Sequence, residues 1–137
     1  MAMWIQILPG SDEPIYLQVA EQISRAIAKG DLVSGDKLPA VRKLASELVI
    51  NPNTVARAYT QLEQAGLVVT KTGSGTFISD PRLRRSDAAD INAVAERMDT
   101  LITRALNLGI EAQDLTELFG SRLARFAGTS NKRTQEK

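Results

Sequence analysis

Residues 39–66 read PAVRKLASELVINPNTVARAYTQLEQAG and contain two short amphipathic segments separated by a turn. In each segment the apolar residues follow one another at spacings of three and four, which is the period of a helix that buries one face. They are Val41, Leu44, Ala45 and Leu48 in the first segment and Val55, Ala58, Tyr59 and Leu62 in the second. The sequence therefore predicts two short helices, each with a narrow buried stripe.

The ends of these two helices carry typical boundary residues. Pro39 suits the first position of the first helix, and Asn51 suits the cap of the second, with Pro52 in its first turn and Gly66 beyond its end. The face of the second helix opposite its apolar stripe is polar. It comprises Asn53, Arg57, Thr60 and Gln64. This pair is typical of a helix-turn-helix with a projecting recognition helix.

An earlier helix precedes this pair. Pro14 opens a segment with an apolar residue at every fourth position, and Gly30 ends it. The apolar residues are Ile15, Val19, Ile23 and Ile27. The short apolar stretch at residues 4–8 predicts either a strand or a flap laid over the core.

A β-hairpin is predicted after the helix-turn-helix. Residues 67–72 and 76–79 are apolar and β-branched, and Gly73-Ser74-Gly75 between them is a tight turn with Lys71 and Thr72 close by. The fold class is therefore mainly α with a small β-hairpin wing: an N-terminal winged helix-turn-helix followed by a C-terminal α-helical hairpin.

Asp80-Pro81 and the basic residues Arg82, Arg84 and Arg85 mark a connector. We expect a winged helix-turn-helix domain at residues 1–80, and a connector and two-helix dimerisation region at residues 81–137 with a frayed tail from Gly128. The apolar residues of the two helices are Ile91, Val94, Met98, Leu101, Leu108, Leu115, Leu118, Phe119, Leu123 and Phe126. A lone helical hairpin has nothing to cover them, which predicts a two-fold homodimer.

Composition restricts the function. The chain lacks cysteine and histidine, and its net charge is only +1, so bulk charge does not indicate a nucleic-acid partner. The carboxylates at Asp87, Asp90, Glu96 and Asp99 fit helix-start and solvated charges. We therefore expect no enzyme, no cofactor and no metal site. No apolar run spans a bilayer and no leader pattern opens the chain, which predicts a cytoplasmic location.

The order of these motifs over residues 14–78 resembles the GntR family of bacterial transcription regulators. The segments GDKLPAVR, NPNTV, GLV and GSGTF carry the resemblance, and NPNTV with only two further helices resembles its YtrA subfamily. The resemblance implies a DNA-binding transcription regulator, with repression as the favoured sign. The two-fold dimer predicts that its operator is palindromic. The implied DNA-binding residues are Arg42, Lys43, Asn51, Asn53, Thr54, Arg57, Lys71, Thr72, Gly73 and Ser74. Pro52 and Ala56 stand where many members have arginine, so base contacts are expected from Asn53, Thr54 and Arg57.

Each of these residues also has a plainer explanation. Asn51 fits a helix cap, Arg57 an ordinary solvated arginine, and Lys43 a surface pair with Glu47. The apolar seam of the first C-terminal helix fits packing better than a ligand site; it comprises Ile91, Val94, Met98, Leu101, Ala105 and Leu108. The main alternative function is a winged helix that contacts protein or RNA. The sequence neither shows nor excludes a bound effector.

Overall fold

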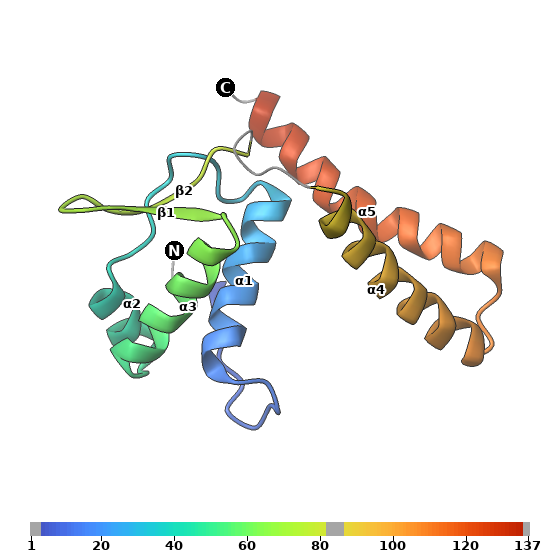
Figure 1. Ribbon diagram of the computed structural model, residues 1–137, viewed down its shortest axis with the longest axis horizontal. Coiled ribbons are helices and arrows are strands. Elements are labelled where there is room, and N and C mark those ends of the chain that lie inside the picture. The colour runs from blue at the N-terminus through green and yellow to red at the C-terminus, as the bar shows by residue number, and fades with distance from the viewer. Residues whose placement is uncertain (1–3, 82–86, 136–137) are drawn as a thin grey trace. The chain divides into compact units, whose positions relative to one another are not determined.

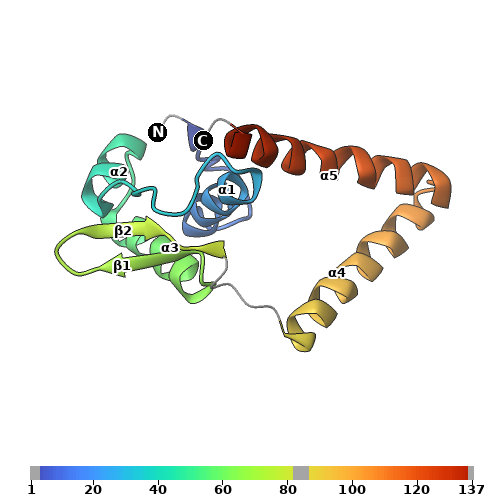
Figure 2. The ribbon, with the colours of Figure 1, turned by 90° about the horizontal axis from the view of Figure 1, so that it is seen from above.

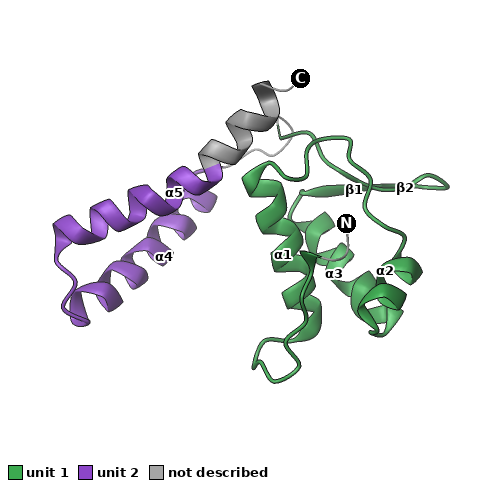
Figure 3. Cartoon of the chain, turned by 180° about the vertical axis from the view of Figure 1, so that it is seen from behind, with its two compact units in different colours: residues 1–84 green, residues 85–137 purple. Residues whose placement is uncertain are grey.

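The computed structural model describes residues 4–81 and 87–135, with side chains described as far as residue 126 (Figure 1). The chain forms two compact units, residues 1–84 and 85–137 (Figure 3). The expected basic connector at Arg82, Arg84 and Arg85 lies outside the described residues. Within the described residues, no helix is long and apolar enough to cross a membrane.

Helix α1 spans Ile15–Lys29 in the first unit. Its predicted apolar stripe is confirmed: Val19, Ile23 and Ile27 are buried in the core. The helix ends at Gly30, which has φ +83° and donates its N–H to the carbonyls of the last turn. A residue with a Cβ is strained in that left-handed conformation, which explains glycine there.

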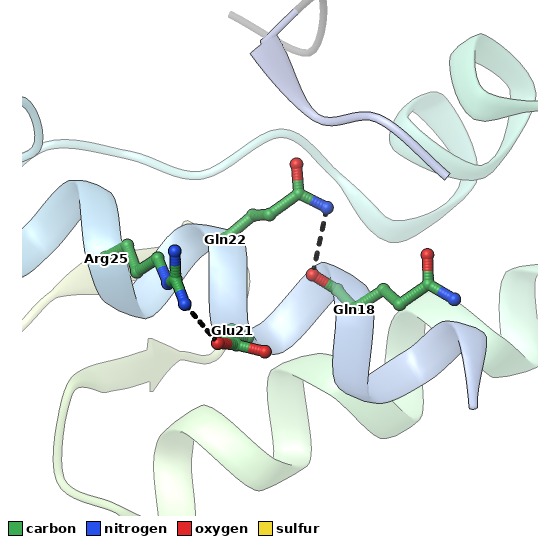
Figure 4. A network of polar contacts seen from close by, with 4 residues as sticks. All are labelled: Gln18, Glu21, Gln22 and Arg25. Carbon is green, nitrogen blue, oxygen red and sulfur yellow. Dashed lines mark hydrogen bonds and ion pairs between the residues drawn. The ribbon is translucent and has the colours of Figure 1, made fainter. Parts of the chain in front are cut away.

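The N-terminal segment is a flap and not a strand, which decides between the two alternatives. Ile5 is buried against the core. Two glutamines of α1 hold the backbone beside it: Gln22 exchanges two hydrogen bonds with Gln6, and Gln18 exchanges two with Leu8. Both glutamines extend from the same helix (Figure 4). The side-chain amides thus satisfy the main-chain groups that a strand partner would otherwise pair.

Helices α2, Val41–Leu48, and α3, Pro52–Gln64, form the predicted helix-turn-helix. Helix α2 begins at Val41, so the prediction that Pro39 is its first residue is wrong by two residues. Ala40 is the N-cap, with a non-helical ψ of 147°, and its carbonyl accepts the N–H of Leu44. Pro39 lies before the cap, where its carbonyl accepts the Tyr59 hydroxyl at 2.7 Å. This bond ties the start of α2 to α3.

All four predicted stripe residues of α3 are buried. They are Val55, Ala58, Tyr59 and Leu62. The helix packs against α1 and α2 on this side. Asn51 caps it as predicted, because its side-chain oxygen accepts the N–H of Asn53 at 2.8 Å. The packing and the cap together fix where the outer face of α3 points.

The wing consists of antiparallel strands β1, Val68–Lys71, and β2, Gly75–Ile78. Lys71 faces Gly75 across the hairpin, so the turn comprises Thr72, Gly73 and Ser74. The predicted turn was one residue too far along the chain, because Gly75 belongs to β2. The hairpin projects beyond the helices (Figure 2).

The second unit is the predicted helical hairpin of α4, Ala88–Asn107, and α5, Ala112–Gln135. Asp87 and Asp90 form a reciprocal capping box at the start of α4, in which each side chain accepts the other's backbone N–H. Two of the four clustered carboxylates therefore act as helix-start residues, as expected. Helix α5 continues past Gly128, where we expected a frayed tail.

Candidate nucleic-acid interface

The outer face of α3 offers polar groups to solvent. Asn53, Thr60 and Gln64 are exposed there, and Thr54 is half-buried. The Thr60 hydroxyl donates to the Ala56 carbonyl one turn earlier, which leaves its oxygen as an acceptor. This face presents amide and hydroxyl groups of the kind that contact base edges and phosphates in a DNA groove.

Arg57 is exposed, but it does not extend freely from α3. Its guanidinium carbon lies 3.9 Å from the centre of the Tyr16 ring on α1. A guanidinium stacked on an aromatic face keeps its edge N–H donors available while losing fewer conformations on binding. Tyr16 was missed from the sequence because it belongs to the earlier helix. The stack places a preoriented cation where α1 and α3 meet.

Arg42 and Lys43 lie side by side on α2 and are both exposed. The structure shows no ion pair between Lys43 and Glu47, although it does show one of this i, i+4 spacing between Arg25 and Glu21 on α1. The plainer explanation for Lys43 as a surface pair is therefore wrong. Both cations remain free to meet an anionic partner.

The wing carries further predicted site residues: Lys71 at the end of β1 and Thr72, Gly73 and Ser74 in the turn, all exposed. Gly73 has φ +81°, which the turn requires.

The hairpin is anchored to α3, because the Thr70 hydroxyl donates to the Glu63 carboxylate at 2.6 Å. Neither Thr70 nor Glu63 was predicted. This bond helps to fix the wing relative to the predicted recognition helix.

Burial raises the pKa of the Tyr59 phenol above its ordinary range, which keeps it protonated as a donor to Pro39. The residues described contain no cluster of three or more acidic side chains that could hold a metal ion. The arrangement offers donors, cations and a projecting hairpin, which suit binding to an extended anionic surface.

The second unit presents an apolar surface. Eight of the ten predicted dimerisation residues are exposed: Ile91, Val94, Met98, Leu101, Leu108, Leu118, Phe119 and Leu123. Leu115 and Phe126 are half-buried. Ile102 and Leu106 are also exposed and were missed. A groove of about 280 Å³ between α4 and α5 is lined almost entirely by apolar side chains, Met98, Leu101 and Phe119 among them.

A three-helix unit with a short second helix, a projecting third helix and a β-hairpin wing is the fold of a winged helix-turn-helix DNA-binding regulator. Residues 15–78 match the family described as "Bacterial regulatory proteins, gntR family". The chain belongs to this family of transcription regulators and is not an enzyme.

Individual relatives place it more closely. The chain is similar to the HTH-type transcriptional repressor YtrA of Bacillus subtilis (strain 168), with 40% identity over 82% of this chain and 87% of that protein. The chain is also similar to the crystal structure of a transcriptional antiterminator from Listeria monocytogenes EGD-e, with a TM-score of 0.76 and 30% identity, over 85% of this chain and 87% of that one. The AraR DNA-binding domain in complex with operator ORX1 has a TM-score of 0.50 and 30% identity, over 55% of this chain and 96% of that one.

Proposed function

We propose that this regulator binds a palindromic operator as a homodimer and represses transcription from it. The exposed polar face of α3, flanked by the anchored wing, is the observation that carries the proposal. Repression is supported by the similarity to YtrA, which is named a repressor. Binding to operator DNA is supported by the relative AraR, whose domain was solved on an operator. A protein with this role works in the bacterial cytoplasm, where the chromosome lies.

The proposed contacts divide into two groups. Asn53, Thr54 and Arg57 stand on or beside the outer face of α3 and read base edges in the major groove. The remaining residues hold the sugar-phosphate backbone: Arg42 and Lys43 on α2, Asn51 at the start of α3, and Lys71, Thr72, Gly73 and Ser74 on the wing. Asn51 serves mainly as the cap, since its side-chain oxygen is already occupied by Asn53. Phosphate contacts position the protein, and base contacts give specificity.

Replacing Arg57 with alanine tests the major-groove assignment. Because the guanidinium is exposed and stacks only on Tyr16, we expect the fold to survive. We expect the affinity for a selected duplex to fall by roughly 1 to 3 kcal/mol. Arg97→Ala, which removes an exposed arginine of α4, is the matched control. A normal circular-dichroism melt together with unchanged duplex affinity for Arg57→Ala would refute the assignment.

The proposed dimer rests on the exposed apolar residues of α4 and α5. Val94 is 57% exposed and Leu101 55%, and both belong to the same seam on α4. Burying one such side chain fully stabilises an assembly by about 1.5 to 3 kcal/mol, so a surface with eight of them exposed strongly favours a partner. A second copy of the chain offers the same surface, and a two-fold interface is self-complementary.

Light scattering of the full-length protein tests this assembly. The wild type should have the mass of two chains, whereas the double variant Val94→Glu/Leu101→Glu should have the mass of one. Two carboxylates per chain would otherwise be buried at the interface without partners. Asn92→Glu, which adds a carboxylate elsewhere on α4, should remain dimeric. A monomeric wild type, or a double variant that remains dimeric, would contradict the proposal.

Contact with RNA is a second candidate function, which the name of the similar Listeria monocytogenes protein, a transcriptional antiterminator, favours. The two functions separate in one competition experiment on the full-length protein. A DNA operator reader prefers a selected DNA duplex to an RNA hairpin, because A-form RNA has a major groove too deep and narrow for side chains to read. Preference for the hairpin would favour RNA contact.

A further inference from the structure

Lys37 lies outside the hairpin in sequence but belongs to the wing in space. The segment before α2 pairs with β2 through three backbone hydrogen bonds. Gly35 donates its N–H to Ile78 at 3.0 Å, and the other two bonds are 2.8 Å long. In these, Leu38 donates its N–H to Thr76, and Ile78 donates its N–H to Asp36. Lys37 itself forms an isolated antiparallel bridge with Phe77. The wing is thus extended by a third, short strand-like segment that carries a lysine.

Gly75 leaves the space that the Lys37 side chain occupies. A Cβ at position 75 would lie 2.7 Å from the Cε atom of Lys37, closer than real Cβ contacts allow. Gly75 also has φ +125°, a conformation that residues with a side chain rarely adopt. The aliphatic part of Lys37 therefore crosses the β2 backbone at a position where any other residue would displace it.

Two lysine ammonium groups meet at one aromatic ring. The Nζ atom of Lys37 lies 6.0 Å from the centre of the Phe77 ring, and the Nζ atom of Lys71 lies 5.2 Å from the same centre. Both lysines are exposed. Neither forms an ion pair with a carboxylate among the residues that the structure describes.

Like charges near one ring repel each other, and a single exposed ring compensates only weakly. An anionic backbone that runs along this part of the wing would be attracted by both ammonium groups and would reduce that repulsion. The wing is also the part of this fold that lies beside the DNA backbone in the proposed function.

We propose that Lys37 and Lys71 together bind one stretch of the sugar-phosphate backbone of duplex DNA, with Gly75 and Phe77 as positioning residues. This inference rests on the proposed function, since it requires that the wing face DNA. It adds to that function a residue outside the hairpin. Contacts to phosphate carry no sequence information, so the pair contributes equally to every duplex.

A purely structural role for Lys37 is the competing explanation, in which its stem only covers Gly75 and Phe77. Lys37→Met separates the two roles, because methionine keeps an unbranched apolar stem and removes the charge. Lys37→Arg keeps the charge. Lys29→Met removes a lysine at the end of α1 and serves as the control.

The experiment measures how the affinity of each full-length variant depends on salt, using both a duplex selected by the wild type and a duplex of arbitrary sequence. The affinity falls as salt rises, so the slope of log K against log salt is negative. Each lost phosphate contact reduces the magnitude of this slope by about 0.9. We expect that loss for Lys37→Met and Lys71→Ala, about 1.8 for the double variant, and the same values on both duplexes. Lys37→Arg and Lys29→Met should match the wild type.

Gly75→Ala adds a test of positioning. It should displace the end of the Lys37 side chain and reduce the magnitude of the slope by less than Lys37→Met does, and it should change nothing further when combined with Lys37→Met. Circular dichroism establishes folding, and Lys37→Met still decides the question if Gly75→Ala does not fold. An unchanged slope for Lys37→Met, or a loss confined to the selected duplex, overturns this inference while the proposed function stands. A wild type that binds no duplex overturns both.

Discussion

Removing the Tyr59 hydroxyl should destabilise the first unit and also change how its stability depends on pH. The side chain is 6% exposed, and its hydroxyl donates to the Pro39 carbonyl at 2.7 Å. Tyr59→Phe keeps the ring but leaves that carbonyl without this donor. Because Pro39 is only half-buried and a neutral hydrogen bond contributes about 0.5 to 1.5 kcal/mol net, we expect the free energy of unfolding to fall by that amount at neutral pH.

The alkaline range gives a sharper test. Burial raises the pKa of Tyr59 in the folded protein above the value of about 10 that the unfolded chain has. Above that pH the unfolded state loses the proton while the folded state keeps it. Stability of the wild type therefore falls as pH rises, by at most about 1.4 kcal/mol per pH unit from this group.

Tyr59→Phe lacks this term, so the stability difference between wild type and variant should shrink above pH 10. Urea unfolding at several pH values measures it. Tyr16→Phe, which removes a hydroxyl away from Pro39, is the control. A difference between wild type and Tyr59→Phe that stays constant with pH would refute the reasoning.

Two further stability predictions concern the turn and cap between α2 and α3. Val49 has φ +55° and is 88% exposed, so Val49→Gly should relieve a left-handed strain of about 1 to 2 kcal/mol and raise the melting temperature; a lower melting temperature would contradict this. Asn51→Ala should destabilise the protein by about 1 kcal/mol through loss of the cap to Asn53, and Asn51→Asp should restore most of it in the same melts. Equal melts for the alanine and aspartate variants would show that the cap contributes nothing.

The helices were predictable because their apolar residues repeat with helical period, and that period reports directly which face is buried. The four buried residues of α3 and the exposed seam of α4 follow from it. The start of α2 was misplaced because a proline suits both the first helical residue and the residue before a cap. The position of Pro39 before the cap goes with the hydrogen bond that its carbonyl accepts from Tyr59. That residue lies on another helix, so a local sequence pattern does not reveal the bond.

The sequence predicted which residues of the candidate site are exposed better than it predicted their contacts. The outer face of α3 was visible from spacing, but the stack of Arg57 on Tyr16 joins two helices that are distant in sequence. Lys37 was missed for the same reason, since it reaches the wing only through pairing with β2. The available clue was Gly75, whose lack of a side chain was attributed to the turn alone.

Selection of randomised duplexes by the full-length protein measures whether it binds a symmetric operator. We expect an enriched inverted repeat whose half-sites are centred about one helical turn, 10 to 10.5 base pairs, or a multiple of it apart, because two recognition helices related by a two-fold axis meet the same face of DNA. The Val94→Glu/Leu101→Glu variant should enrich single half-sites weakly. If the wild type enriches no motif, or enriches one half-site without symmetry, it does not bind a palindromic operator as a two-fold dimer.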